Sequence, residues 1–191
     1  MKTGQWFGSG ASTRWWFDTG AGCLDFAYTG GMGDDPDGEL FATPDDLRAW
    51  LAARFDRVDA SASDRDLVDA RSLRAAIAAV ARTLSSGLLP AADDVDTINL
   101  FAATPDIPPS LSGGARRAGR SSVRVGQTLS EIARDAVRLF GEDAGRLRTC
   151  AADDCGLVFY DESRSNNRRW CSMQRCGNRS KVRAHRARTS G

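Results

Sequence analysis

The chain has 191 residues, a length that suits one ordinary domain and a small second one. Hydrophobic residues make up 41% of it, and no run of about 18 apolar residues is present, so we expect no transmembrane helix and no membrane partner. The first residues also lack the apolar core of about 7–15 residues that a secretory signal needs, which predicts a cytoplasmic protein.

The net charge of +1 conceals an asymmetry between two parts of the chain. Residues 1–145 carry 15 Lys and Arg against 21 Asp and Glu, a net charge of −6. Residues 146–191 carry 11 against 4, a net charge of +7. This division predicts a basic module that meets a polyanion, carried by an acidic body with another task. Charge alone leaves a disordered, solubilising tail open as the alternative.

The beginning of the chain predicts few regular elements. Residues 1–13 are rich in Gly, Ser and Thr, and we expect a disordered N-terminus there. Residues 14–18 predict a strand, and residues 23–29 predict a second buried element whose type stays open. Residues 30–39 predict a loop. Its fragment Asp35–Gly38 lacks the downstream Glu of a calcium loop, which favours a solvated turn.

Four helices are predicted by apolar stripes at helical spacing, over residues 45–55, 64–84, 92–102 and 128–141. Thr43 is the expected N-cap of the first, followed by Pro44, and Ser63 caps the second. Thr128, with Glu131 three residues later, forms the capping signal of the last. Residues 104–126 form either a mobile loop or a β-hairpin with a basic tip of Arg116, Arg117 and Arg120.

Four of the five cysteines form two equal pairs: Cys150-x4-Cys155, then 15 residues, then Cys171-x4-Cys176. In a reducing compartment such pairs indicate a metal site, and four thiolates favour one structural zinc ion with no open coordination position. A lobe this small buries too little apolar surface to fold alone, and zinc can supply the stability that is missing. We expect Cys23 to be a buried core thiol, and His185 to be a surface residue or a phosphate contact.

Basic and amide side chains surround the cysteines. On a helix that starts near Cys176, four arginines fall at i, i+4, i+8 and i+11 on one flank. Arg and Asn suit forked contacts with phosphates and base edges, whereas Trp170 is interpreted as core, with base stacking as its alternative. The predicted nucleic-acid contacts are Arg164, Asn167, Arg168, Arg169, Arg175, Asn178, Arg179, Lys181, Arg183 and Arg186.

The segment RTCAADDCGLVFYDESRSNNRRWCSMQRCGNRSKVRAHRAR, residues 148–188, resembles the CGNR-type zinc finger of bacterial proteins. The residues that give that family its name stand here as Cys176, Gly177, Asn178 and Arg179. In the family the finger follows an α/β domain called ABATE, and the stretch GCLDFAYTGG resembles the opening of that domain. Tyr28 departs from the pattern, which has a small polar Asn at this place. The resemblance implies a stress-induced transcription regulator.

The expected architecture is α+β. A mainly helical ABATE-like domain with a few strands covers residues 14–145, and the zinc finger covers residues 146–191 in the order knuckle, hairpin, knuckle, helix. No P-loop, HExxH or G-x-S-x-G motif is present, so no enzyme is expected. We expect a regulator whose finger binds duplex DNA and whose body senses a small molecule or a protein. The alternatives are an RNA- or ribosome-binding module and a protein-interaction knuckle.

Overall fold

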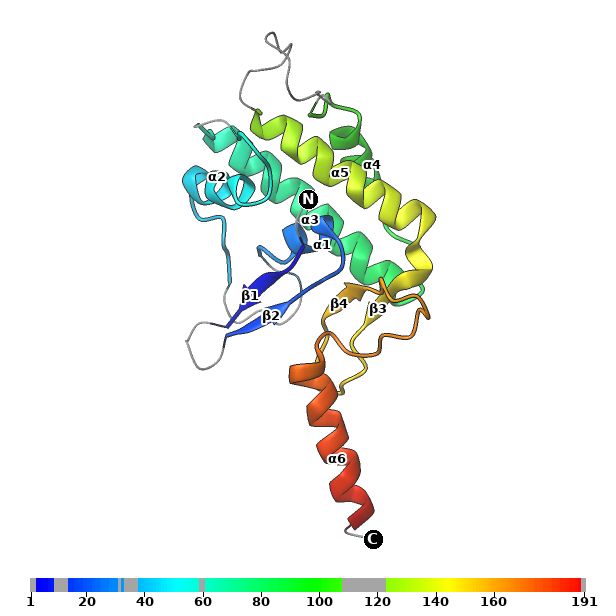
Figure 1. The fold of residues 1–191 in the computed structure, drawn as a ribbon. Coiled ribbons are helices and arrows are strands. Elements are labelled where there is room, and N and C mark those ends of the chain that lie inside the picture. The colour runs from blue at the N-terminus through cyan, green and yellow to red at the C-terminus, as the bar shows by residue number, and fades with distance from the viewer. Residues whose placement is uncertain are drawn as a thin grey trace, which may run out of the picture.

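The computed structural model describes residues 3–8, 14–30, 32, 38–58, 61–107 and 123–189. The fold of this part of the chain is α+β and mainly helical, as predicted, with two small antiparallel sheets. Figure 1 shows the helices gathered into one body, from which the last helix projects. In chain order the elements are β1 (Gln5–Phe7), β2 (Trp15–Phe17), α1 (Gly22–Ala27), α2 (Pro44–Ala52), α3 (Asp64–Ser85), α4 (Ala92–Ala102), α5 (Val125–Glu142), the 3-10 turn η1 (Ala144–Arg146), β3 (Leu147–Thr149), β4 (Val158–Tyr160), the π-helical turn η2 (Met173–Gly177) and α6 (Asn178–Thr189).

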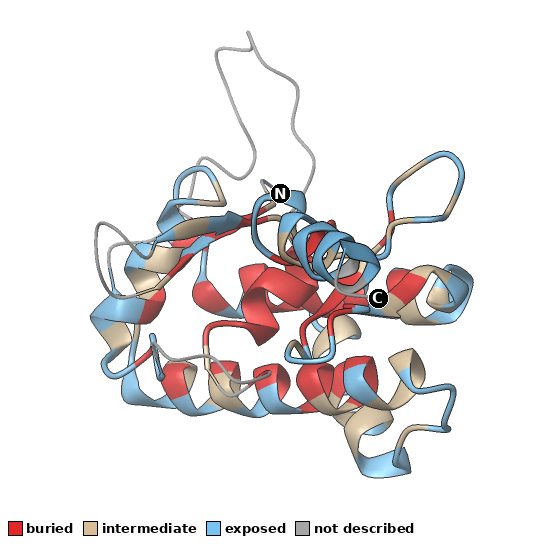
Figure 2. Ribbon diagram, turned by 90° about the horizontal axis from the view of Figure 1, so that it is seen from below, coloured by how far each residue is buried: buried red, intermediate tan, exposed pale blue. Residues whose placement is uncertain are grey.

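The core of the body lies between α1, α3, α4 and α5, which pack against one another. All six residues of α1 are buried, and Figure 2 shows how the buried residues concentrate between the helices. Leu73 and Ile77 of α3 meet this core with no exposed surface, as do Ile132 and Ala133 of α5. Burial of one such Leu or Ile side chain stabilises the fold by about 1.5–3 kcal/mol, so the apolar stripes of the sequence account for the packing.

The N-caps of α2 and α3 lie where the sequence predicts them. The Thr43 hydroxyl accepts from the Asp46 main-chain N–H, and the Asp46 carboxylate accepts from the N–H of Thr43 at 2.8 Å. Ser63 and Asp66 make the same reciprocal pair at the start of α3. Helix α4 has the predicted bounds, whereas α2 ends at Ala52, three residues before the predicted end.

The predicted start of the last body helix is wrong: α5 begins at Val125 and not at Thr128. The Gln127 side-chain oxygen accepts from the main-chain N–H of Arg124 at 3.1 Å, which fixes the earlier start. The Thr128 hydroxyl donates to the Val125 carbonyl at 2.6 Å and therefore lies inside the first turn. Arg116, Arg117 and Arg120 of the preceding segment, and Asp35 of the predicted turn, lie outside the described residues.

The prediction of a disordered N-terminus is wrong for residues 5–7, which form strand β1. β1 pairs with β2 in antiparallel register, with Phe7 opposite Trp15, so the strand predicted over residues 14–18 gains a partner. Phe7 and Phe17 lie on the inner face and pack edge to face against Tyr28. The contacts of Phe7 with distant rings thus outweigh the flexible composition around the strand.

The second buried element, whose type the sequence left open, is helix α1, and the segment before it connects it to the β1–β2 sheet. The Asp25 side chain is fully buried and accepts from the Thr19 hydroxyl at 2.7 Å and from the main-chain N–H of Gly4. Burial raises the pKa of Asp25 to about 6. The carboxyl group of Asp25 therefore links three segments: the residue before β1, the loop before α1, and α1 itself.

The finger is packed directly against the body through the residues on either side of α1. The Tyr28 hydroxyl donates to the Val158 carbonyl at 3.0 Å and accepts from the Val158 N–H at 2.7 Å. The Tyr160 N–H donates to the Thr19 carbonyl at 2.7 Å. Gly20 has a φ of +80°, and a Cβ atom there would lie 2.5 Å from the Tyr160 carbonyl oxygen, so only glycine permits this approach. Tyr28, which departs from the family pattern, thus has a structural task at the junction.

None of the helices within these residues combines the length and the apolar character that crossing a membrane requires.

Candidate metal centre and basic helix

The first cysteine pair lies at the tip of a hairpin. β3 and β4 pair in antiparallel register, with Leu147 opposite Tyr160, and the Cys150 N–H donates to the Leu157 carbonyl just beyond the ladder. The sequence predicts a strand, over residues 157–160, or a hairpin after this knuckle. The structure has strand β4 there and adds strand β3 before the knuckle, so the hairpin encloses the knuckle. The strand that precedes Cys150 was missed because Leu147–Thr149 has a single buried residue and little alternation.

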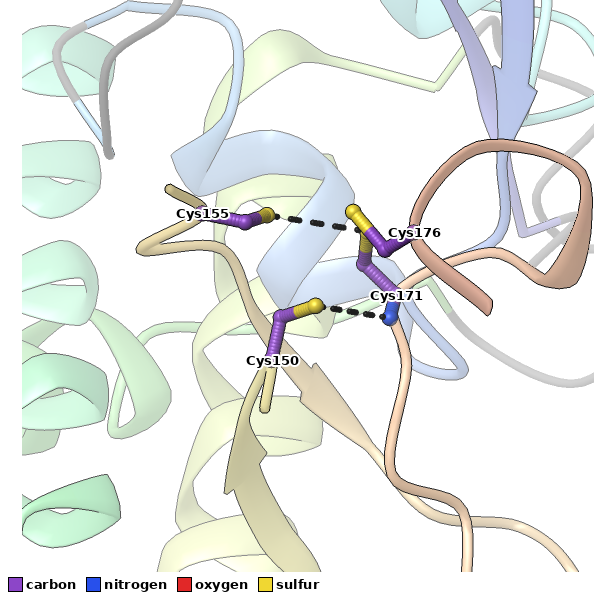
Figure 3. Close-up of side chains that lie close together, drawn as sticks. All are labelled: Cys150, Cys155, Cys171 and Cys176. Atoms are coloured by element: carbon purple, nitrogen blue, oxygen red, sulfur yellow. Dashed lines mark hydrogen bonds between the residues drawn. The ribbon is translucent and has the colours of Figure 1, made fainter. Parts of the chain in front are cut away.

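The four cysteine side chains converge on one point, as Figure 3 shows. Their Sγ atoms all lie within 4.8 Å of one another, with 3.8 Å between Cys155 and Cys171 and 3.5 Å between Cys171 and Cys176. Four sulfurs at about 2.3 Å from a tetrahedral zinc ion stand about 3.8 Å apart, so the cluster has the size that the metal requires. The set Cys150, Cys155, Cys171 and Cys176 is therefore able to hold one zinc ion, as predicted.

Two N–H donors support the sulfurs. The main-chain N–H of Cys171 donates to Cys150 Sγ at 3.4 Å, and the Arg179 guanidinium donates to Cys176 Sγ at 3.4 Å. Such donors stabilise the negative charge that remains on a four-thiolate zinc site. Burial raises the pKa of the Cys176 thiol, whereas hydrogen bonding from Cys171 lowers that of Cys155. Zinc binding favours the thiolate form of all four.

The two other candidate ligands lie outside the cluster, as the sequence predicts. Cys23 is a fully buried residue of α1, and burial, with Asp135 nearby, raises the pKa of its thiol well above the ordinary value. His185 is exposed on α6. The structure thus separates the core thiol and the surface imidazole from the metal site.

Most of the predicted nucleic-acid contacts are exposed. Helix α6 has twelve residues, and Figure 1 shows that it projects away from the helices of the body. Arg179 and Arg168 are half-buried. The exposed members of the predicted set are Arg164, Asn167, Arg169, Arg175, Asn178, Lys181, Arg183 and Arg186.

Arg168 lies inside the finger and not on its surface. Its guanidinium donates to the Asp18 carbonyl at 2.9 Å and to the Cys171 carbonyl at 2.5 Å, and it stacks 4.2 Å from the Phe159 ring. Its Nε donates to the Trp170 carbonyl at 3.1 Å. Burial lowers the pKa of Arg168. We therefore count Arg168 as a link between the finger and the body, a role that a sequence run of arginines does not reveal.

Arg175 also departs from the predicted helical flank. It lies in η2, before α6 begins, and its guanidinium is 4.6 Å from the Trp15 ring of β2. Arg179, Arg183 and Arg186 remain as the arginines of that flank on α6. Trp170 is partly buried and packs against the core, in agreement with the interpretation favoured from the sequence.

An acidic residue that belongs to no recognised sequence motif faces the basic helix. Asp154, in the first knuckle, forms ion pairs with Arg179 at 3.0 Å and with Arg183 at 3.1 Å. Hydrogen bonding from Arg183 lowers the pKa of the Asp154 carboxyl. The sequence shows only two adjacent aspartates before Cys155, and nothing in that pattern indicates which of them meets the helix.

A polar cleft of about 490 Å³ lies where the body meets the finger. One wall is the start of α1, a second is α5, and a third is Tyr160 with Glu162 of the finger. The two arginines of the cleft are already paired, Arg138 with Asp135 at 2.6 Å and Arg134 with Asp106 at 2.9 Å.

Comparison with known families agrees with this architecture. Residues 146–189 match the family described as "CGNR zinc finger". Residues 20–143 match the ABATE family, described as "Putative stress-induced transcription regulator". Neither is an enzyme family, and none of the curated proteins matches the chain. The chain belongs to the ABATE family and carries a C-terminal CGNR zinc finger.

Proposed function

We propose that the protein is a cytoplasmic, DNA-binding transcription regulator whose zinc-held finger presents α6 to duplex DNA. The observation that carries this proposal is a basic helix, α6, that directly follows the cluster of four cysteines and projects away from the helices of the body, as Figure 1 shows. The description of the ABATE family supports a role in transcription. A closed four-thiolate zinc site has no open position for water, which argues against a catalytic role.

The dimensions and charge of α6 suit a nucleic-acid groove. Twelve helical residues span about 18 Å, and the major groove of B-DNA, about 12 Å wide, admits an α-helix. Val182 is 49% exposed, and Lys181 and Arg183 beside it are exposed too, so this stretch of the helix lacks an apolar face buried by the body. The metal site anchors the N-terminal end of the helix, while phosphate contacts along the rest supply affinity that falls steeply with salt.

The direct test is fluorescence anisotropy with zinc-loaded full-length protein and labelled duplex fragments over a series of salt concentrations. We expect the double substitution Lys181→Glu/Arg186→Glu to weaken binding and to lower the slope of log K against log salt by about 2. The matched control is Arg48→Glu/Arg65→Glu, which makes the same change of charge on α2 and α3 of the body. Absence of binding to any duplex at low salt by the zinc-loaded protein would overturn the proposal.

One observation favours an RNA- or single-strand-binding function as the second candidate. Trp6 and Trp16, on the outer face of the β1–β2 sheet, are 56% and 44% exposed and form an edge-to-face pair at 5.4 Å. The Arg14 guanidinium lies 5.4 Å from the Trp6 ring. Exposed rings beside a cation suit unpaired bases. Competition between duplex DNA and structured RNA decides: preference for RNA that is lost in Trp6→Ala/Trp16→Ala would favour this candidate.

We further infer that the body senses its signal, a small molecule or a protein, at the cleft shared with the finger. Its volume of about 490 Å³ falls within the range of ligand sites, and its walls come from both parts of the chain. A ligand at a hundred times its Kd would stabilise the fold by about 2.7 kcal/mol, which a thermal-shift screen detects. A ligand that raises the Tm through the cleft and leaves DNA affinity unchanged would contradict this coupling.

A further inference from the structure

We propose that Arg179 and Arg183 form a phosphate-binding site on α6 and that Asp154 is the internal anion which a nucleic-acid phosphate must displace. This inference rests on the proposed function, because it names the phosphate contact and its regulation at the same surface. Asp154 is therefore a built-in competitor rather than only a part of the knuckle.

The geometry is that of an anion held between two guanidiniums. Arg179 Nη2 lies 3.0 Å from Asp154 Oδ1, and Arg183 Nη2 lies 3.1 Å from Asp154 Oδ2, so each carboxylate oxygen serves a different arginine. The two arginines are four residues apart on α6 and therefore on one face of the helix. Guanidinium groups bind carboxylate and phosphate oxygens through the same N–H donors, so a phosphate fits the position that the carboxylate fills.

The pairing is accessible and exchangeable. The side chains of Asp154, Arg179 and Arg183 are 43%, 39% and 54% exposed, so a phosphate can approach all three from solvent. Ion pairs as exposed as these contribute little to stability, which makes displacement of the carboxylate inexpensive. By contrast, the guanidinium of Arg168 bonds to main-chain carbonyls and is half-buried, and we expect no exchange there.

The two sides of the site are positioned by the metal centre. Asp154 directly precedes Cys155, and Arg179 donates to the sulfur of Cys176 at 3.4 Å. With zinc bound, the carboxylate is held at the arginines at a high effective concentration. Isolated anions compete poorly with such a carboxylate, whereas a nucleic acid that displaces the carboxylate gains further contacts along α6. Asp154 thus suppresses binding to dilute, scattered anions.

The test compares Asp154→Asn with Asp153→Asn in the zinc-loaded full-length chain. Asp153 is the matched control, because it is exposed in the same knuckle and forms no ion pair within the part of the chain that the structure describes. Both substitutions remove one negative charge, so any difference reports the contact with the arginines. We expect Asp154→Asn to tighten binding of a labelled DNA duplex about two- to fivefold more than Asp153→Asn does. Asp154→Glu retains the carboxylate and is expected to bind as the unsubstituted chain does.

Equal effects of the two Asn substitutions, or weaker binding by Asp154→Asn with zinc still stoichiometric, would overturn the proposal and make Asp154 a residue that only positions α6. A second probe, inorganic pyrophosphate measured by calorimetry, separates this result from failure of the proposed function. If no duplex binds but Asp154→Asn binds pyrophosphate more tightly than Asp153→Asn does, the anion site stands and DNA binding fails. If the duplex binds and neither probe distinguishes the two variants, DNA binding stands and the anion site fails.

Discussion

The body and the finger pack against each other, but different interactions stabilise the fold of each part. The body has a core of apolar side chains between α1, α3, α4 and α5. The finger contributes a few buried residues around its cysteines, such as Leu157 and Phe159, whereas Val182 of its longest helix is 49% exposed. Stability in the body is therefore spread over many contacts, whereas in the finger it is concentrated on one ion and on the junction.

The largest expected effect is loss of the metal. Cys171 is buried at the centre of the cluster, and Cys171→Ser removes one of four ligands. Zinc contributes about 10–16 kcal/mol of apparent binding free energy in zinc-finger peptides, so we expect the finger to lose both zinc and its protection from hydrogen exchange while the body keeps its helices. Elemental analysis and hydrogen exchange measure the two quantities. Cys23→Ala is the control and should retain zinc; a folded finger in metal-free Cys171→Ser would contradict the comparison.

A core truncation in the body should have a smaller and purely local effect on stability. Ile77 of α3 has no exposed surface, and Ile77→Ala leaves a cavity in the core. We expect a loss of about 2–5 kcal/mol in the free energy of unfolding, measured by denaturant titration, with zinc content unchanged. Val68, on the same helix but 60% exposed, provides the control Val68→Ala, which should cost far less. Zinc loss in Ile77→Ala would show that the two parts are less separate than proposed.

The junction can be tested by removing a single hydroxyl. Tyr28→Phe leaves the ring in place but deprives the buried N–H and carbonyl of Val158 of their partner. We expect a cost of about 2–3 kcal/mol and faster hydrogen exchange at Val158, with zinc still bound. The other tyrosine, Tyr160, is only partly buried, so Tyr160→Phe is the control. Unchanged exchange at Val158 would mean that the hydroxyl does not hold the finger to the body.

The two parts should also respond to pH with opposite signs. Burial raises the pKa of Asp25 to about 6, above the value of about 4 in an unfolded chain, so the folded body binds the extra proton. Its stability should therefore fall by up to about 2 kcal/mol as the pH rises from 4 to 6, and Asp25→Asn should abolish this fall. The finger should lose zinc as the pH falls, because acid protonates its thiols. Urea titrations and zinc release over this range measure both trends, and a rise in body stability with pH would contradict the assignment to Asp25.

Local signals of the sequence predicted the elements that depend on local chemistry. Thr43 and Ser63 were predicted as caps because each directly precedes a helical apolar pattern, and Pro44 follows Thr43; the structure adds a reciprocal partner three positions on in each case. The metal site was predicted because the Cys-x4-Cys spacing occurs twice, and this spacing can be recognised without knowing the fold. The predicted start of α5 was wrong because two capping signals overlap in the sequence. The helix uses the earlier one, Arg124 with Gln127, and not Thr128 with Glu131.

Residues whose roles depend on distant contacts could not be predicted. Strand β1 is stable because Phe7 reaches Phe17 and Tyr28, and no local pattern contains those partners. Arg168 looks like its neighbour Arg169 in the sequence, yet it bonds to the Asp18 carbonyl 150 positions away. Asp154 differs from Asp153 only in what α6 places opposite it.

The glycine at the junction has a mechanical consequence. Gly20 allows the main chain before α1 to touch the carbonyl of Tyr160, and the Thr19 carbonyl bonds to the N–H of the same residue. The finger is thus clamped sideways instead of hanging from the short stretch that follows α5. We expect extra residues inserted into that stretch to leave α6 where it is, because the contacts of Thr19 and Gly20 with Tyr160 fix the finger on the body.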